Sequence, residues 1–565
     1  MLARAGACAA LLVAWTGTAW AQAGRPSDAD IFGGAQPAPA QPAPAQPAPA
    51  QPGPAQPPPV APPATATPGA NTPAAEPPPA AAAASEALGT ERDRSVLGNT
   101  GGEVQHLSDY QAPENPLQIG GQIYLRTQGT ALQGDAPDRW SLNAPSLLDA
   151  YFDARPNPRV RAFILGRMSY NPTAAPSGAA ETTVNGLPVG SQGAFAGGSP
   201  TGFTTFTAAR GPTSVLDQMW IRFDVAQRVF VTAGKQHVRW GTGRFWQPTD
   251  YLHLLKRNPL DVFDARQGTS MLKLHMPWEQ RGWNFYAFGV FEDPNLATNN
   301  LRRLAGAARA EIVLGSAEIG LDAFVKRDQK PRFGIDFSAG IWDFDVYADV
   351  AIRSGEDFNV VERVPSTTMC ALPGTDPNMP TVLTDDLASQ YAVRTLSGIK
   401  TQAVGGINWQ HKYNDNDMFV LGAEYFYNQP GYSDPSLYPG LLANQSGTPM
   451  LNFFYTGRNY AALFASFPAP YSWNYTTFTF STLSNLSDMS FVSRLDYSVT
   501  LLTHLTLEAF AGVHYGTRGG EFRITIDIDP ATGRNAAGFC DTIPPVGIHQ
   551  PPPLVDLGVA LRMKI

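Results

Sequence analysis

Apolar and polar side chains alternate along stretches of about ten residues from residue 117 onward. Residues 333–341, FGIDFSAGI, and residues 344–353, FDVYADVAIR, place apolar side chains at every second position, and residues 319–326 and 505–515 repeat the pattern. Successive side chains of a β-strand point to opposite faces of the sheet, so each stretch predicts a strand with one apolar and one polar face. The chain is therefore predicted to be all-β over residues 117–565.

Apolar and polar residues also alternate in the strands of a soluble β-sandwich, so alternation alone does not identify a membrane barrel. Strand length and loop length distinguish the two. The predicted strands run for about ten residues, whereas strands of soluble proteins centre on about five or six. The connections between them alternate between short and long. Short connections fall at 155–159, 226–228, 315–316 and 342–343, and long ones at 171–213, 356–397 and 517–553. Tight turns on one side and long loops on the other are typical of outer-membrane barrels.

The last predicted strand is VDLGVALRMKI, residues 555–565. In a closed barrel the final strand pairs with the first, which leaves no sheet edge open. The stretch resembles the C-terminal signal by which outer-membrane proteins are recognised for insertion, which implies the barrel-assembly machinery as a partner. It departs from that signal at Ile565, where an aromatic residue is usual. Roughly 16 to 18 strands can be counted, and eighteen, an even number, requires residues 460–467 to be a strand.

The first residues have the pattern of an export signal. Arg4 supplies a positive charge, an apolar run follows, and Ala19 and Ala21 fit the small residues of a cleavage site. Residues 1–21 are therefore assigned to a signal peptide. Residues 22–116 are rich in Pro and Ala and are predicted to be disordered, because proline removes backbone donors and such a sequence cannot build a core. This periplasmic segment is either a passive spacer or a tether that contacts peptidoglycan.

Composition narrows the class of protein further. Charged residues make up 16% and aromatic residues 11% of the chain, with 53 Gly and 51 Pro, which suits many strands and turns. No run of about 18 uncharged apolar residues follows the signal, which excludes a helical membrane protein. The net charge of −8 gives no support to a nucleic-acid partner. Cys370 and Cys540 remain after the signal, and a disulfide between them is expected if both lie in loops on the same side of a barrel.

Residues 117–565 thus resemble a porin-type β-barrel of the Gram-negative outer membrane. The resemblance rests on the signal, the alternation, the loop asymmetry and the last strand. It implies a transmembrane antiparallel β-barrel of about 16 to 18 strands, embedded in outer-membrane lipid behind a disordered periplasmic segment. It also implies diffusion of small hydrophilic solutes through a water-filled lumen, in which one external loop commonly folds inward as a charged constriction.

Residues 235–268, KQHVRWGTGRFWQPTDYLHLLKRNPLDVFDARQG, are the candidate for such a loop. Five basic residues against three aspartates leave a local excess of two positive charges. A fixed charge in a narrow pore with a low-dielectric wall acts strongly on a passing ion, so a weak preference for anions is predicted. The alternative is that these charges pair with one another and pin the loop, and both can hold together. The predicted constriction residues are Arg239, Arg244, Asp250, Lys256, Arg257, Asp261, Asp264 and Arg266.

Catalytic chemistry finds little support in the sequence. The eight histidines are scattered without the spacing of a metal site, and Ser498 and His504 are accompanied by no serine-hydrolase motif. No enzymatic activity, metal or cofactor is predicted. The predicted function is a diffusion channel with a charged inward loop. The alternatives are a substrate-specific uptake channel and a structural outer-membrane protein linked to the cell wall through its Pro/Ala-rich segment.

Overall fold

The computed structural model describes most of the chain after residue 115. The described residues are 116–174, 182–184, 187–189, 211–253, 256–260, 266–291, 304–363, 391–413, 418–443, 453–528, 531–534, 540–543 and 548–565. The predicted signal peptide and the Pro/Ala-rich segment lie outside these ranges, apart from Pro116.

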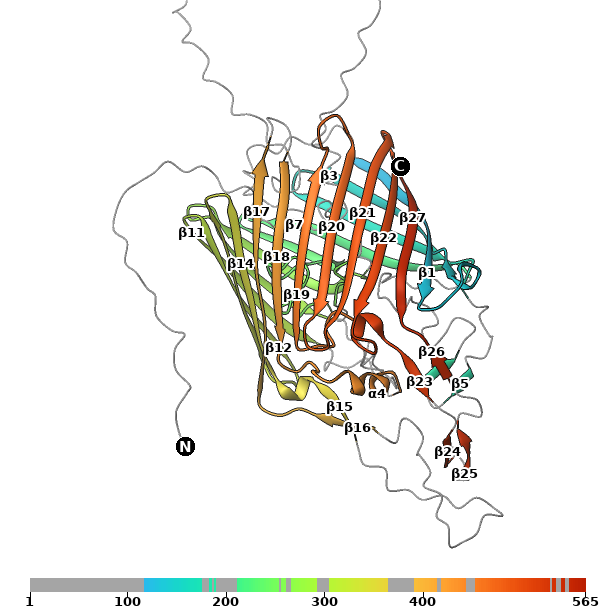
Figure 1. Ribbon diagram of the computed structural model, residues 1–565. Coiled ribbons are helices and arrows are strands. Elements are labelled where there is room, and N and C mark those ends of the chain that lie inside the picture. Colours follow the sequence, from blue (N-terminus) through green and yellow to red (C-terminus); the bar gives the residue numbers. More distant parts are fainter. Residues whose placement is uncertain are drawn as a thin grey trace, which may run out of the picture.

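Eighteen antiparallel strands form a closed barrel (Figure 1). They are β1 (Leu117–Leu132), β3 (Ser146–Asn157), β4 (Val160–Tyr170), β7 (Thr213–Val225), β8 (Val229–Gln236), β9 (Thr269–Trp278), β10 (Trp283–Val290), β11 (Ala305–Leu314), β12 (Ala317–Lys326), β13 (Arg332–Ile341), β14 (Phe344–Ser354), β17 (Ile399–Lys412), β18 (Met418–Asn428), β19 (Asn459–Pro468), β20 (Thr476–Asn485), β21 (Ser490–Leu502), β22 (Leu505–Gly516) and β27 (Pro553–Lys564). The ring closes where β27 pairs with β1, from Gln122 opposite Lys564 to Leu132 opposite Pro553. The predicted fold class is confirmed, and the strand predicted at residues 460–467 is β19.

Short turns lie at one end of the barrel and long loops at the other. The predicted short connections all fall between paired strands, as at residues 315–316 between β11 and β12, and the long ones fall between β4 and β7, β14 and β17, and β22 and β27. In Figure 1 the labelled elements of these loops gather at the lower end, whereas the C-terminus lies at the upper end. The loop elements are β2 (Ser141–Asn143), β5 (Thr182–Val184), β6 (Leu187–Val189), β15 (Asn359–Arg363), β16 (Tyr391–Thr395), α4 (Tyr438–Ala443), β23 (Ile526–Ile528), β24 (Ala531–Arg534), β25 (Cys540–Ile543), β26 (Ile548–Gln550) and the 3-10 turns η2 (Pro137–Arg139), η4 (Gly355–Asp357), η6 (Pro435–Leu437) and η7 (Glu521–Arg523).

No helix in the described part of the chain is long and apolar enough to cross a membrane.

The wall of the barrel is apolar on its outer face and largely polar on its inner face. In β13, Ile335 and Phe337 are 44% and 36% exposed, whereas Asp336 between them is 2% exposed. Asp349 of β14, which lies opposite Asp336, is also fully buried. The alternation of the sequence therefore turns apolar side chains outward, which is the reverse of a soluble protein and the arrangement that a lipid environment favours.

Exposed aromatic side chains mark both ends of the outer wall. At the short-turn end they come from three strand connections, and one of them, Trp278, packs against the half-buried Trp283 with the ring centroids 5.7 Å apart. Aromatic girdles of this kind occur at the two membrane–water interfaces of barrel proteins. The exposed members are Trp278, Trp342, Phe344, Tyr471 and Trp473 at the short-turn end and Tyr170, Phe291 and Tyr515 at the long-loop end.

The apolar core lies inside the barrel, toward the long loops, where simple alternation would place polar side chains. Strand β10 shows the departure most clearly, because Tyr286, Phe288 and Val290 are buried on its inner face. They form one cluster with Trp240 and Tyr251, which belong to the connection between β8 and β9. The inner wall is therefore apolar where a loop packs against it, and its sequence carries apolar residues on both faces there.

Candidate functional site

The connection between β8 and β9, described at residues 237–253, 256–260 and 266–268, crosses the interior of the barrel. Strand β18, which the tip of this connection reaches, lies across the ring from β8 and β9. Six strands separate it from β9 in one direction, and nine separate it from β8 in the other. The loop nevertheless bonds to β13, where Tyr251 Oη donates to the Phe333 carbonyl at 2.7 Å. It also bonds to β21, where Arg494 Nη1 donates to the Leu260 carbonyl at 2.9 Å. We call residues 237–268 the inward loop.

A single carboxylate on the far wall holds the tip of the inward loop. Glu424 of β18 accepts the backbone N–H groups of Arg244 at 2.7 Å, Phe245 at 3.1 Å and Trp246 at 2.9 Å. Tyr347 Oη of β14 donates a fourth hydrogen bond to the same carboxylate at 2.8 Å. Hydrogen bonds to an ionised group are about twice as strong as neutral ones, so these four bonds fix the tip firmly.

Aromatic packing adds to this contact. Trp246 is fully buried, and its ring stacks on Phe426 with the centroids 5.6 Å apart. Its indole Nε1 donates to the Phe454 carbonyl at 2.8 Å, so the polar atom of the side chain is satisfied. Beside it, Phe245 meets Phe464 of β19 edge to face, with the centroids 5.8 Å apart. The loop tip thus contributes two aromatic side chains to an apolar cluster inside the barrel.

Just before its tip, the inward loop passes so close to β14 that a glycine is needed. Gly241 has a φ of +88°, and a Cβ there would collide with the Asp349 carboxylate. The same carboxylate accepts a hydrogen bond from Thr249 Oγ1 at 3.0 Å, and Thr242 Oγ1 donates to the Ala348 carbonyl at 3.1 Å. The wall of β14 therefore fixes the loop on both sides of its tip.

Three of the predicted constriction residues form a compact ion cluster within the inward loop. Arg266 Nη1 lies 2.9 Å from Asp250 Oδ2, and Lys256 Nζ donates to the Asp250 carbonyl at 3.1 Å. His253 Nδ1 lies 3.0 Å from Asp250 Oδ1. Burial alone would raise the pKa of Asp250, but His253, Arg266 and Lys256 outweigh it and hold that pKa below its usual value. Burial lowers the pKa of Lys256 to about 8. These residues fit the prediction that the loop charges pair and pin the loop.

Three other predicted residues, all arginines, gather near the loop tip. Burial lowers the pKa of Arg244 to about 10; the charges of Arg257 and Arg239 act in the same direction, and Tyr347 and Glu424 act against it. The guanidinium of Arg244 lies over the Phe464 ring at 3.9 Å. A pKa near 10 leaves Arg244 charged at neutral pH. Arg239 is exposed, and its Nη2 donates to the Gly243 carbonyl at 3.2 Å. We call Arg239, Arg244 and Arg257 the arginine cluster.

Most of the remaining predicted residues lie outside the described ranges. Asp261 and Asp264 lie outside the described residues, as does Cys370. Cys540 begins β25 in the loop between β22 and β27. The selectivity role of the loop and the disulfide therefore stay predictions. Glu424 and Tyr347 were not among the predicted site residues; alternation indicates that Glu424 faces inward, but the sequence carries no signal for the backbone it binds.

A pair of buried carboxylates, Glu521 and Asp488, ties together three connections at the long-loop end of the barrel. Glu521 Oε1 accepts the Phe454 backbone N–H at 2.6 Å, and its Oε2 accepts the Tyr460 hydroxyl at 2.6 Å. Asp488 Oδ2 accepts the Glu521 backbone N–H and the Tyr438 hydroxyl, both at 2.8 Å. Burial and then the charge of Asp488 raise the pKa of Glu521 to about 8. This clasp joins the loops that follow β18, β20 and β22.

No metal-binding site is found among the described residues. Within the described ranges, no group of three or more His, Cys, Asp or Glu side chains is placed to hold a metal ion. His237 illustrates the alternative use of such residues, because its Nε2 lies 3.1 Å from Asp217 Oδ1 in a buried ion network that also contains Arg167. On this part of the inner wall, the charged side chains bind one another.

Comparison with known proteins returned structural likenesses only. No protein-family model matches the sequence, and no curated protein matches it. OccAB1 of Acinetobacter baumannii is 10% identical with a TM-score of 0.41, over 81% of this chain and 99% of that one. OpdK of Pseudomonas aeruginosa, solved with vanillate, is 10% identical with a TM-score of 0.40, over 79% and 98%. A mutant Rhodopseudomonas blastica porin is 9% identical with a TM-score of 0.34, over 80% and 100%. Identities and TM-scores this low do not bear on function or on individual residues.

Proposed function

We propose that the chain is an outer-membrane channel through which small hydrophilic solutes diffuse, with the inward loop as its constriction. The observation that carries the proposal is a charged loop fixed across the interior of a closed barrel by Glu424 on the far wall. A closed barrel leaves no backbone edge open to lipid, and an apolar outer face between two aromatic girdles suits a bilayer. The proposed role of the protein is therefore transport, and the proposal includes no catalytic step.

The arginine cluster sets the proposed selectivity. The predicted loop charges divide into the Asp250 cluster, whose members bind one another, and the arginine cluster near the tip. Because neighbouring positive charges in a constricted, poorly screened space attract anions, a modest anion preference follows. The proposed orientation puts the short turns and the N-terminal segment in the periplasm and the long loops outside.

Conductance measurements test the proposal directly. The refolded protein, inserted into a planar bilayer, is expected to give discrete current steps, and a salt gradient is expected to give a reversal potential of the sign for anion preference. Refolding is checked by the heat-modifiable mobility of a closed barrel. A folded barrel that inserts but passes no ions would refute the channel, and a cation-selective reversal potential would refute the assignment of the arginine cluster.

A substrate-specific uptake channel is the second candidate. The observation that favours it is the position of the Arg244 guanidinium over the Phe464 ring, since an arginine beside an aromatic face suits a solute with a carboxylate and an apolar part. Such a channel predicts that a carboxylated solute blocks the ionic current in a dose-dependent way, whereas a general pore shows no block. The third candidate, a structural link to the cell wall, concerns residues 22–116 and predicts no conductance.

A further inference from the structure

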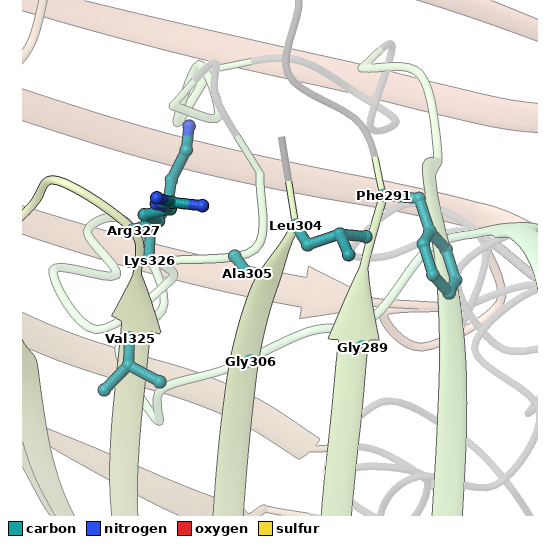
Figure 2. A pocket seen from close by; sticks show the side chains of 8 residues that line it. All are labelled: Gly289, Phe291, Leu304, Ala305, Gly306, Val325, Lys326 and Arg327. Carbon is teal, nitrogen blue, oxygen red and sulfur yellow. The ribbon is translucent and has the colours of Figure 1, made fainter. Parts of the chain in front are cut away.

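A shallow groove lies on the outer face of the barrel at the long-loop end of β10, β11 and β12. Its volume is about 450 Å³. Figure 2 shows Gly289 and Gly306 between Val325 and Phe291, with Lys326 and Arg327 at the end of β12. The two glycines are direct partners in neighbouring strands, so two adjacent side chains are missing from the wall at one place. The groove therefore interrupts the apolar outer face.

Close packing does not require glycine at either position. A Cβ on Gly289 would lie 3.8 Å from Phe291 Cζ, and one on Gly306 would lie 3.5 Å from Val325 Cγ2, both ordinary contact distances. Neither glycine has a positive φ, unlike Gly241 of the inward loop. Backbone geometry therefore gives no reason for the two missing side chains. The paired glycines leave room in the wall that an occupant can fill.

The groove is apolar within the wall and basic at its rim. Phe291 and Val325 are 50% and 51% exposed, so the occupant meets hydrocarbon there. Beyond them lie Lys326, the last residue of β12, and Arg327 and Lys330 of the turn to β13, against one acidic residue, Asp328, which leaves two net positive charges. An apolar trough that ends in a basic rim is complementary to a molecule with an acyl chain and a negatively charged headgroup.

We propose that this groove binds a phosphorylated glycolipid of the outer leaflet, with an acyl chain over Gly289 and Gly306 and a phosphate at Arg327 and Lys326. The inference rests on the proposed outer-membrane location, which puts the long-loop end of the wall in the outer leaflet. Bulk lipid is as apolar as the groove, so hydrophobicity alone cannot select one lipid there. Selection comes from the fit of the chain into the trough and from hydrogen bonds between guanidinium or ammonium groups and phosphate.

The test is a lipid titration of the full-length protein, refolded in lipid-free detergent and observed by native mass spectrometry. The probes are lipid A, dephosphorylated lipid A and phosphatidylglycerol. We expect one lipid A adduct at concentrations where neither other lipid binds. Arg327→Ala with Lys326→Ala is expected to require at least about tenfold more lipid A, because each basic residue near a lipid surface contributes a several-fold effect. Gly289→Val, which fills the trough, is expected to weaken binding similarly.

Matched controls separate this site from general lipid association. Gly405→Val adds the same side chain elsewhere on the outer face, where nothing lies within 4 Å of the added Cβ, and Arg228→Ala removes a positive charge from a short turn at the opposite end. Both are expected to bind lipid A like the unaltered protein. Equal binding of the three lipids, or unchanged binding by the groove variants, would overturn the inference. A barrel that conducts but binds no lipid A overturns only this inference, whereas one that binds lipid A but does not conduct overturns only the channel.

Discussion

Replacing Glu424 by glutamine is expected to loosen the inward loop and to make the channel wider and noisier. The ionised carboxylate accepts the backbone N–H groups of Arg244, Phe245 and Trp246 and the hydroxyl of Tyr347. Glutamine keeps the size of the side chain but has one acceptor oxygen, and its amide N–H groups would point at other donors. At least two of the four hydrogen bonds should therefore be lost.

The magnitude follows from the number of bonds. A hydrogen bond to a charged group contributes about 1.5–3 kcal/mol, so the loss of two weakens the hold on the loop by roughly 3–6 kcal/mol. Since about 1.4 kcal/mol corresponds to a factor of ten, the ratio of fixed to released loop should fall by roughly a hundredfold or more. Tyr347→Phe removes one bond from a neutral donor and leaves the three backbone donors in place, so its effect should be markedly smaller.

Single-channel recording in planar bilayers measures this effect. Glu424→Gln should show a larger mean conductance and more current noise than the unaltered protein, with Tyr347→Phe between the two. Heat-modifiable mobility on gels first confirms that each variant has folded as a closed barrel. If folded Glu424→Gln gave the same conductance and noise as the unaltered protein, the carboxylate would not be what fixes the loop.

Three further predictions concern selectivity, pH and assembly. Arg244→Ala with Arg257→Ala should reduce the anion preference several-fold, seen as a smaller reversal potential in a salt gradient. The pKa of Glu521 is raised from 4.5 to about 8, so the folded protein keeps a proton that the unfolded chain releases. The stabilisation that this proton contributes is fully present below about pH 4.5 and is lost as the pH rises through about 8. The melting temperature should thus be lower at about pH 9 than at about pH 6, and Glu521→Gln should remove most of the difference. Deleting residues 555–565 should abolish the heat-modifiable form, because β1 and β22 would both become open edges.

Each of these has its own control and contrary result. Arg159→Ala, at a short turn, should leave the reversal potential unchanged, and an equal effect of Arg159→Ala and the double variant would argue against the arginine cluster. A Glu521→Gln variant with an unaltered pH dependence would show that other groups cause it. A closed, heat-modifiable barrel from the chain without residues 555–565 would contradict the pairing of β27 with β1.

The strands were predictable because their signal is local. Period-two alternation needs only neighbouring residues, so residues 333–341 and 344–353 foretold β13 and β14, with the turn at Trp342 and Asp343 between them. Turn and loop lengths are equally visible in sequence. The inner face of β10 was not predictable in this way, because Tyr286 and Phe288 are buried by a loop that comes from elsewhere in the ring.

The sequence draws attention to the loop between β8 and β9 but not to the contacts that fix it. The charge-rich stretch between β8 and β9 was recognisable from its composition, yet the division of its charges into the Asp250 cluster and the arginine cluster depends on how the loop folds. The bond between Arg244 and Glu424 joins residues 180 positions apart, and its donor is a backbone N–H, which every residue except proline has. A contact of this kind therefore cannot be predicted from the pattern of side chains.

That backbone contact has a consequence for how such a channel can change over evolution or in engineering. Because Glu424 binds peptide N–H groups, these hydrogen bonds do not depend on which side chain residue 244 carries, proline excepted. In the proposed channel, the side chain at this position and the atoms that fix the loop are therefore separate, so substitutions here should alter permeation without removing the hydrogen bonds that hold the loop. A library of variants at this position would sample permeation properties on one unchanged scaffold.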